Sequence, residues 1–293
     1  MTRKEKSIRT GTLTLDGIPP DYREHGDGPP LLLLPGGAGH AAVLDGLAAH
    51  LADQYRVVAM SSRLVSARAH VDQQPKVYAE DAVGLINTLF DEPPAVFGFS
   101  AGAITTLELL ARHPERLRLG VVHEPPLLEV LPDAGRHRDA LEAVRTAART
   151  QGLEEAARLM TRTMMAVEPA TDSPDVRHPG DWLNGYAETL PEPPTPELLD
   201  LFAVLGQLQP LFLEHVLIPF TTTEFDLAAL GAVGPRLVPV AGIDSRGQLP
   251  HRTATALAAK LGLSLNELPG GHLGPVERPA QFAGALKALL EGR

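Results

Sequence analysis

The residues of this sequence best suited to chemistry surround a serine between two glycines. Residues 98–102 read Gly-Phe-Ser-Ala-Gly, with Ser100 at the centre. A serine hydroxyl is a weak nucleophile, so it needs an adjacent base and must stand clear of its own backbone. A sharp turn from a strand into a helix presents it in this way, and small residues two before and two after the serine prevent clashes. An apolar run precedes Ser100 and a helical pattern follows it, which favours a nucleophile over a glycine-rich packing turn.

The base for such a serine must be one of 11 histidines, and their positions in the chain distinguish them. His272 lies in a Gly-Gly-His-Leu-Gly segment just after the last expected strand. Active sites of parallel α/β sheets gather at the C-terminal ends of the strands, so we predict that His272 is the base. His123 also ends an expected strand; it could line the pocket, although a structural role fits it better. His113 and His137 lie on or near expected helices and are interpreted as surface residues.

A carboxylate should complete the site by orienting the histidine and stabilising its charged form. We predict Asp244 for this role, because it follows the expected strand 237–241 and leaves room for a helix and a strand before His272. Glu124 is the main alternative, since it too follows an expected strand. Asp226 precedes the strand at 237–241 and is interpreted as a connector.

The negative oxygen that forms when a carbonyl is attacked needs two hydrogen-bond donors. We predict that one is the backbone N–H of Ala101, directly after the serine, and that the other is the N–H of Gly37 in the Pro-Gly-Gly-Ala-Gly segment 35–39. That segment could instead cradle a phosphate, but a phosphate loop ends in Gly-Lys-Ser or Gly-Lys-Thr, and here His40 and Ala41 follow. A dinucleotide site would require an acidic residue at the end of the next strand, which ends without one.

The composition allows one large α/β domain or two small domains. Of the 293 residues 44% are apolar and only 4% aromatic, so we expect a core of Leu, Val and Ala. The net charge of −10, without a basic run, argues against nucleic acid and an anionic membrane surface as partners. The absence of cysteine excludes disulfides, thiolate metal sites and a cysteine nucleophile. The sequence shows neither a signal-peptide pattern nor a membrane span, and we expect a cytoplasmic protein.

Short apolar runs alternate with helical patterns in the first part of the chain and again near its end. Such alternation predicts a parallel sheet covered by helices on both faces. Residues 8–15 and 20–25 could add an antiparallel hairpin at the edge of the sheet. The other expected strands are 31–34, 56–60, 95–99, 119–123, 237–241 and 263–268, and the expected helices lie near 41–53, 77–90, 102–112, 250–261 and 277–291.

The middle of the chain has a different pattern, with no convincing strand between residues 127 and 224. Because strands resume afterwards, we interpret residues 127–224 as a helical cap inserted into one core of residues 1–126 and 225–293; a separate helical domain is the alternative. Helices in the cap are expected near 136–150, 153–166, 181–189, 196–206 and 209–217. The cap should set the choice of substrate. The candidates to line its pocket are Phe99, His123, Met160, Met164, Met165, Trp182, Phe212 and His215, although a place in the core of the cap fits the last six better.

Together these segments resemble the α/β-hydrolase superfamily, and within it the capped branch of esterases, lactonases, cofactor-free haloperoxidases and C–C bond hydrolases. The resemblance covers nearly the whole chain and rests on the segments 35–39, 98–102, 242–244, 271–272 and 277–279. It implies a mostly parallel, twisted sheet flanked by helices, with an all-helical cap. It also implies the chain order of nucleophile, acid and base in which Ser100, Asp244 and His272 occur.

Two segments depart from the pattern of that superfamily. Many members have a histidine before the glycine of the oxyanion loop, where this chain has Pro35. Many also have an Asp-x-Arg-Gly-x-Gly-x-Ser turn, where residues 61–68 lack both glycines and the aspartate, so we expect another shape for this loop. A serine nucleophile argues against the epoxide hydrolase and haloalkane dehalogenase branches, which need a carboxylate.

The expected function is hydrolysis of an ester, thioester or lactone of a mostly hydrophobic small molecule, through an acyl-enzyme on Ser100. One alternative is C–C bond cleavage, or a cyclising or lactonising step, on the same residues. A second alternative is a ligand receptor that uses the pocket without turnover. We expect no metal or organic cofactor, and a homodimer through the cap or an edge strand is compatible with the sequence.

Overall fold

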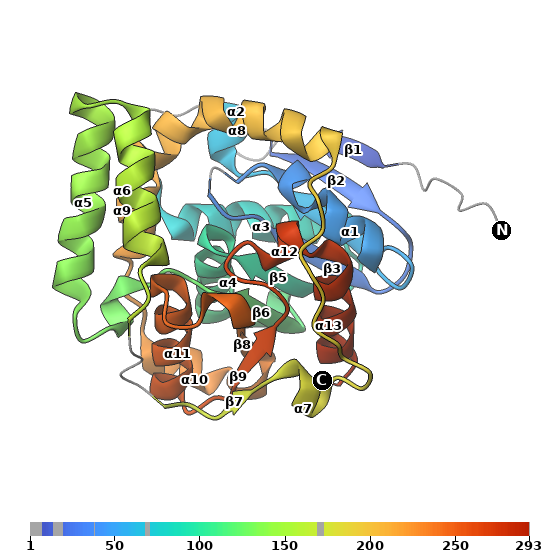
Figure 1. Ribbon diagram of the computed structural model, residues 1–293. Helices are drawn as coiled ribbons and strands as arrows, with labels where there is room; N and C mark the ends of the chain where they lie inside the picture. The colour runs from blue at the N-terminus through green and yellow to red at the C-terminus, as the bar shows by residue number, and fades with distance from the viewer. Residues whose placement is uncertain (1–7, 14–19, 38, 68–70, 169–172, 293) are drawn as a thin grey trace.

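The computed structural model describes residues 8–13, 20–37, 39–67, 71–168 and 173–292, which fold around a nine-stranded, mostly parallel sheet (Figure 1). The strand order is β1-β2-β4-β3-β5-β6-β8-β9-β7. The pairs β1–β2 and β2–β4 are antiparallel, and the other pairs are parallel. The strands are β1 (Arg9–Thr12), β2 (Asp21–His25), β3 (Pro30–Leu34), β4 (Arg56–Met60), β5 (Ala95–Phe99), β6 (Leu119–His123), β7 (Val176–Arg177), β8 (Leu237–Gly242) and β9 (Leu265–Leu268).

Both faces of the sheet are buried, which explains why its strands are continuously apolar. In β3, Leu31 and Leu33 belong to one core cluster, and Leu32 and Leu34 belong to another. Successive residues of a strand point to opposite faces, so a strand covered on both sides needs apolar side chains throughout. The first face packs against α1 (Asp45–Leu51) and α13 (Pro279–Glu291), and the second against α3 (Pro75–Leu89), α4 (Ala101–Arg112) and α11 (Leu249–Leu261).

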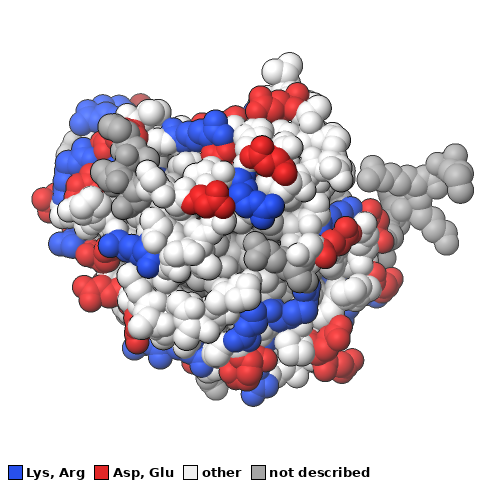
Figure 2. Space-filling model, turned by 90° about the horizontal axis from the view of Figure 1, so that it is seen from below, with Lys and Arg blue, Asp and Glu red and all other residues white. Residues whose placement is uncertain are grey.

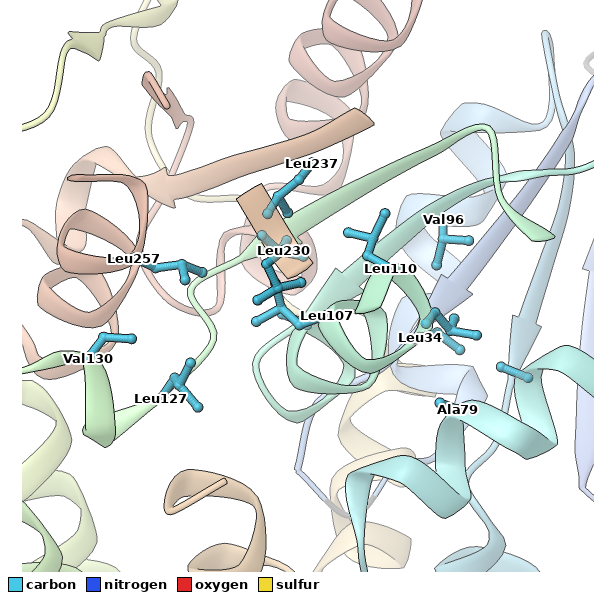
Figure 3. Packing of buried hydrophobic residues seen from close by; sticks show 14 of the residues in the cluster. Leu34, Ala79, Val96, Leu107, Leu110, Leu127, Val130, Leu230, Leu237 and Leu257 are labelled. Atoms are coloured by element: carbon cyan, nitrogen blue, oxygen red, sulfur yellow. The ribbon is translucent and has the colours of Figure 1, made fainter. Parts of the chain in front are cut away.

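The second core cluster extends from the sheet into the segment that follows β6 (Figure 3). Leu127 and Val130 belong to the same buried cluster as Leu34 and Val96 of the sheet and Leu257 of α11. The start of the segment interpreted as a cap therefore packs with the core. The limits of the insert at 127 and 224 stay a prediction.

The α/β class with a mostly parallel sheet flanked by helices is confirmed, and the expected strands and most expected helices are present. The edge hairpin is formed by β1 and β2; residues 14 and 15 of its expected range lie outside the described part of the chain. The loop after β4 takes a helical shape, α2 (Arg63–Ala67), and residue 68 lies outside the described part. Outside α5 to α9, which are described next, the structure also has the short helices α10 (Leu227–Ala232) and α12 (Gly274–Glu277). Its 3-10 turns are η1 (Ala41–Leu44), η2 (Pro114–Arg116), η3 (Leu128–Val130), η4 (Gly234–Arg236) and η5 (Ile243–Ser245).

The inserted segment forms an antiparallel-looking pair, α5 (Ala134–Thr150) and α6 (Leu153–Met165), at the left of Figure 1, together with α8 (Pro196–His215) and α9 (Leu217–Thr221). Three expectations are wrong here. The helix expected at 181–189 is a single turn, α7 (Pro179–Trp182). The two helices expected at 196–206 and 209–217 are one helix, α8, which continues through Pro210. The insert is not entirely helical, because β7 joins the sheet beside β9.

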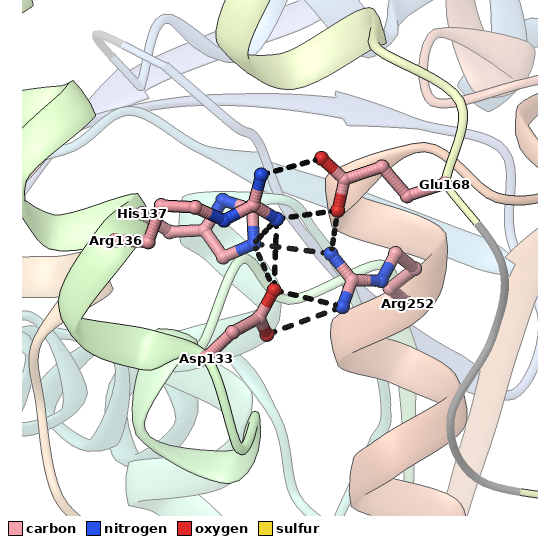
Figure 4. A network of polar contacts seen from close by, with 5 residues as sticks. All are labelled: Asp133, Arg136, His137, Glu168 and Arg252. Carbon is pink, nitrogen blue, oxygen red and sulfur yellow. Dashed lines mark hydrogen bonds and ion pairs between the residues drawn. The ribbon is translucent and has the colours of Figure 1, made fainter.

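A network of charged side chains ties the insert to the core (Figure 4). Arg252 of α11, of which only 4% is exposed, donates to both carboxylate oxygens of Asp133 at 3.1 Å and to Glu168 at 2.6 Å. Arg136 of α5 donates to Asp133 at 2.8 Å and also contacts Glu168, and His137 lies 3.0 Å from Asp133. A nearly buried guanidinium is stable only when its charge is matched, so this network should fix the insert on the core.

The surface carries charges of both signs. On the face that Figure 2 presents, Lys and Arg side chains are interspersed with Asp and Glu side chains. None of the described helices combines the length and apolar character required to cross a bilayer.

The charged network leads to a stability prediction. Arg252→Ala should lower the free energy of unfolding by about 2 kcal/mol, because it leaves two partly buried carboxylates with only Arg136 to neutralise them. Arg138→Ala is the matched control, since Arg138 also contacts both oxygens of one carboxylate, Glu129, but is about half exposed. Arg138→Ala should lower the free energy of unfolding by less than about 1 kcal/mol. Urea unfolding followed by circular dichroism measures both, and equal losses would contradict the role given to Arg252.

Candidate active site

Ser100 lies at the sharp turn between β5 and α4. Its φ of 55° and ψ of −117° are rare for a residue with a side chain and raise the Ser100 hydroxyl above the C-terminal edge of the sheet. The turn needs glycine at two positions: a Cβ on Gly98 would overlap Thr106, and a Cβ on Gly102 would overlap the carbonyl of Leu34. These two glycines therefore allow the strained turn that the pentapeptide predicted.

A chain of hydrogen bonds connects Ser100, His272 and Glu124. The Nε2 of His272 lies 3.1 Å from the Oγ of Ser100, and its Nδ1 lies 2.8 Å from the Oε2 of Glu124. An ionised carboxylate can only accept, so the Nδ1 of His272 carries the proton and donates a hydrogen bond to Glu124. The lone pair of Nε2 then faces the serine hydroxyl. This is the tautomer that a base needs in order to take a proton from serine.

Glu124 is a fully buried carboxylate with three hydrogen-bond donors around it. Its Oε1 accepts from the backbone N–H of Gly242 at 2.8 Å and from the hydroxyl of Ser245, while Oε2 accepts from His272. Burial alone would raise the pKa of Glu124, but the hydrogen bond from His272, the nearby histidine rings and the hydroxyl of Ser245 lower this pKa to about 2. Glu124 is therefore ionised at neutral pH. Its backbone has a φ of 48°, again rare for a residue with a side chain.

The prediction that Asp244 would orient His272 is corrected by this geometry. The carboxylate of Asp244 is 48% exposed and forms an ion pair with Arg278 at 2.5 Å. Glu124 and Asp244 follow β6 and β8, which are neighbours in the sheet, so both acids reach the same edge. The guanidinium of Arg278 binds Asp244 near the surface, while Ser245 and Gly242 bind Glu124 in the interior. Glu124, the alternative from the sequence, is the acid that contacts His272.

His123 lies beneath the site and does not line it. Its side chain is completely buried, and its Nε2 lies 3.3 Å from the backbone oxygen of His272. Burial is the main cause that lowers the pKa of His123 to about 4, so the ring is neutral at pH 7. The prediction that His123 contacts substrate is therefore wrong; it supports the loop that carries His272.

The two expected oxyanion donors belong to segments that lie next to Ser100. Ala101 is the first residue of α4, where backbone N–H groups have no partner within the helix. Gly37 has a φ of 58° and lines the same cleft as Ser100. A Cβ on the preceding Gly36 would lie 2.7 Å from the Cβ of Ser100, so glycine lets this loop lie directly against the nucleophile. The roles of Gly37 and Ala101 stay predictions.

A large cleft of about 1040 Å³ opens above Ser100 and His272. Four of the side chains expected in the pocket line it: Phe99, Met160, Met164 and Phe212. Two further walls of the cleft were not predicted from the sequence: the proline-rich segment 191–195 and the first half of α8. The sequence contains a pattern that could have indicated the second wall, because its apolar side chains recur at helical spacing: Leu198, Leu201, Phe202 and Leu205.

Three other expected pocket residues lie elsewhere. The indole Nε1 of Trp182 donates to the carbonyl of Arg177, 3.3 Å away. The Nδ1 of His215 lies 3.3 Å from a carboxylate oxygen of Asp72. Met165 is 48% exposed at the end of α6. None of the three is among the described residues that line the cleft, so the predictions for Trp182, His215 and Met165 as cleft residues are wrong.

One group of side chains has the donor atoms for a metal ion. Asp133, His137 and Glu168 bring three potential ligand atoms within 4.8 Å of one another. The guanidinium groups of Arg136 and Arg252 already bind these carboxylates, and two positive charges at that distance oppose a cation. We interpret the group as the structural network described above.

Comparisons with known proteins agree with this fold. A family model described as "alpha/beta hydrolase fold" matches residues 29–163. An uncharacterised hydrolase, YraK, of Bacillus subtilis (strain 168) is 30% identical over 291 residues, which cover 97% of each chain. A zearalenone hydrolase of Cladophialophora bantiana is 27% identical over 290 residues, 94% of each chain. The solved structure of a thermophilic esterase from Thermogutta terrifontis has a TM-score of 0.68 at 17% identity, covers 97% of this chain and 98% of its own, and shows the same fold.

The buried carboxylate of Glu124 predicts a pH dependence of stability. The pKa of Glu124 is about 2 in the folded chain and near its ordinary value of 4.5 in the unfolded chain. A lowered pKa gives stability that is complete above 4.5 and is lost as the pH falls towards 2. Between about pH 5 and pH 3, the free energy of unfolding should therefore fall more in the wild type than in Glu124→Gln, as urea titrations at each pH would show.

The control for this experiment is Glu115→Gln, which removes a carboxylate that is 64% exposed. It should keep the pH dependence of the wild type. If Glu124→Gln has the same pH dependence as the control, Glu124 is not held as a buried ion.

Proposed function

The chain belongs to the α/β-hydrolase family and is an enzyme with the fold of that family, and from this premise we propose that Ser100, His272 and Glu124 form its catalytic triad. The observation that carries the proposal is the pair of hydrogen bonds on the ring of His272, 3.1 Å to the serine oxygen and 2.8 Å to the carboxylate. A nucleophile, a base and an orienting acid in this arrangement activate serine on several unrelated folds.

In the proposed reaction, the Oγ of Ser100 attacks the carbonyl carbon of an ester while its proton passes to the Nε2 of His272. The N–H groups of Gly37 and Ala101 stabilise the negative oxygen that results. The bond to the leaving oxygen then breaks, and that oxygen takes the proton from His272. A water molecule gives a proton to Nε2 and attacks the acyl carbon, after which Ser100 recovers its proton and the acid is released. Glu124 stays ionised throughout and stabilises the charged imidazole.

We propose an ester, thioester or lactone of a mostly hydrophobic small molecule as the substrate. Phe99, Met160, Met164 and Phe212 give the cleft that contains Ser100 an apolar lining, as small-molecule sites commonly have. A relative named zearalenone hydrolase, 27% identical along nearly its whole length, makes zearalenone one compound to include in a substrate panel. No step of the proposed reaction requires a metal or an organic cofactor.

The role of Ser100 is tested by its removal. Ser100→Ala should lower kcat on an activated ester by at least about 10⁴-fold, because no other group replaces the nucleophile. A fluorophosphonate should label the wild type, and peptide mass spectrometry should place the adduct on Ser100. Turnover that survives in Ser100→Ala, or an adduct on another residue at the same rate, would refute the assignment.

The identity of the acid is tested by a matched pair of amide substitutions. Glu124→Gln should lower kcat by about 10³-fold or more, because an amide neither stabilises the charged imidazole nor selects the correct tautomer. Asp244→Asn should change kcat by less than about fivefold, since it removes only a half-exposed ion pair with Arg278. Steady-state kinetics on one activated ester measure both. The opposite order of effects would return the role to Asp244.

A further inference from the structure

We infer, on the basis of the proposed function, that the first half of α8 is the binding wall for a long or polycyclic, uncharged apolar part of the substrate. Leu198, Leu201, Phe202 and Leu205 recur at helical positions i, i+3, i+4 and i+7 and therefore share one side of the helix. All four line the cleft that contains Ser100. The apolar side of α8 thus forms part of the lining of the cleft that contains the nucleophile.

In the described part of the chain, none of these four side chains is buried. Within α8, the side chains that are buried are Leu208 and Leu213, both in its second half. Leu198 and Leu201 are half-buried, and Phe202 is 47% exposed although it lines the cleft. An amphipathic helix is stable when its apolar side is removed from water. In this cleft, an apolar substrate is the group that would cover it and remove its apolar surface from water.

The dimensions favour a substrate larger than a short acyl ester. The cleft of about 1040 Å³ lies at the upper end of the volumes of sites for drug-sized ligands, about 300–1,000 Å³. From Leu198 to Leu205 the wall rises about 10 Å at 1.5 Å per residue. A short acyl group at Ser100 would leave most of this wall exposed to water.

The charges of the cleft disfavour an anionic substrate. Among the described residues that line the cleft, Arg23 alone has a cationic side chain. Its guanidinium contacts the carboxylate of Asp45 at 2.8 and 2.6 Å. A substrate carboxylate or phosphate would therefore meet no unpaired guanidinium or ammonium on the described lining. It would instead face the side chains of Glu192, Glu197 and Glu277.

The experiment measures how fast alkyl fluorophosphonates label Ser100, which requires an activated serine but no deacylation. Three probes share one reactive group and carry an ethyl chain, a decyl chain, or a decyl chain that ends in a carboxylate. The decyl probe should label the wild type at least about tenfold faster than the ethyl probe, and the carboxylate should lower the decyl rate about tenfold. Leu201→Gln should lower the decyl-to-ethyl ratio about fivefold, because it places an amide on the wall.

Leu199→Gln is the matched control for Leu201→Gln, since Leu199 is 53% exposed and does not line the cleft. It should keep the wild-type ratio. Each ratio compares two probes on the same serine, so a partly unfolded variant lowers both rates and leaves the ratio unchanged.

Three results would overturn the inference. Equal rates for the ethyl and decyl probes, with Ser100 labelled, would refute the apolar wall and leave the proposed catalytic triad intact. A loss of the ratio in Leu199→Gln as large as in Leu201→Gln would refute the assignment to one side of α8. No labelling of Ser100 by any probe would refute the proposed triad, and the inference would fail with it.

Discussion

The hydrogen bond between the Nδ1 of His272 and the Oε2 of Glu124 is the contact on which the rest of the site depends. A carboxylate without exposed surface is costly unless its charge is matched by donors, and here three donors from the ends of two strands surround it. Glu124 follows β6, Gly242 and Ser245 lie at and after the end of β8, and His272 follows β9. Ser100 follows β5, and its N–H donates to the carbonyl of His123 at 2.9 Å. Four parallel strands thus assemble one site at their common edge.

The sheet could be predicted from the sequence because strands buried on both faces are uninterrupted runs of apolar residues. Residues 31–34 are apolar without interruption, and they alternate between the two core clusters. Two features of the insert have no such pattern in the sequence. Val176 and Arg177 form β7 with both side chains exposed, so no apolar pattern marks them. A proline in a helical sequence usually indicates a break, but α8 continues through Pro210. Pro210 removes a single backbone donor, and the buried side chains of Leu208 and Leu213 hold the helix on either side of it.

The site was predictable where local backbone rules apply and ambiguous where tertiary contacts decide. Gly98 and Gly102 mark the turn at Ser100 because no other residue fits there. Asp244 and Glu124 both follow strands that end at the same edge, and the sequence cannot show that Arg278 binds one while Ser245 binds the other. The left-handed backbone of Glu124 is also invisible in sequence, since residues with side chains rarely adopt it. The helical spacing of the apolar residues in α8 shows that they share one side of the helix. The spacing alone does not show whether that side faces a core or a cleft.

The most direct test of this account is a proton NMR spectrum of the Nδ1–H of His272 in the wild type, Glu124→Gln and Asp244→Asn. A proton shared with an ionised, buried carboxylate is strongly deshielded and exchanges slowly with water. The account predicts a low-field resonance in the wild type that persists in Asp244→Asn and disappears in Glu124→Gln. A resonance that persists in Glu124→Gln and disappears in Asp244→Asn would contradict it.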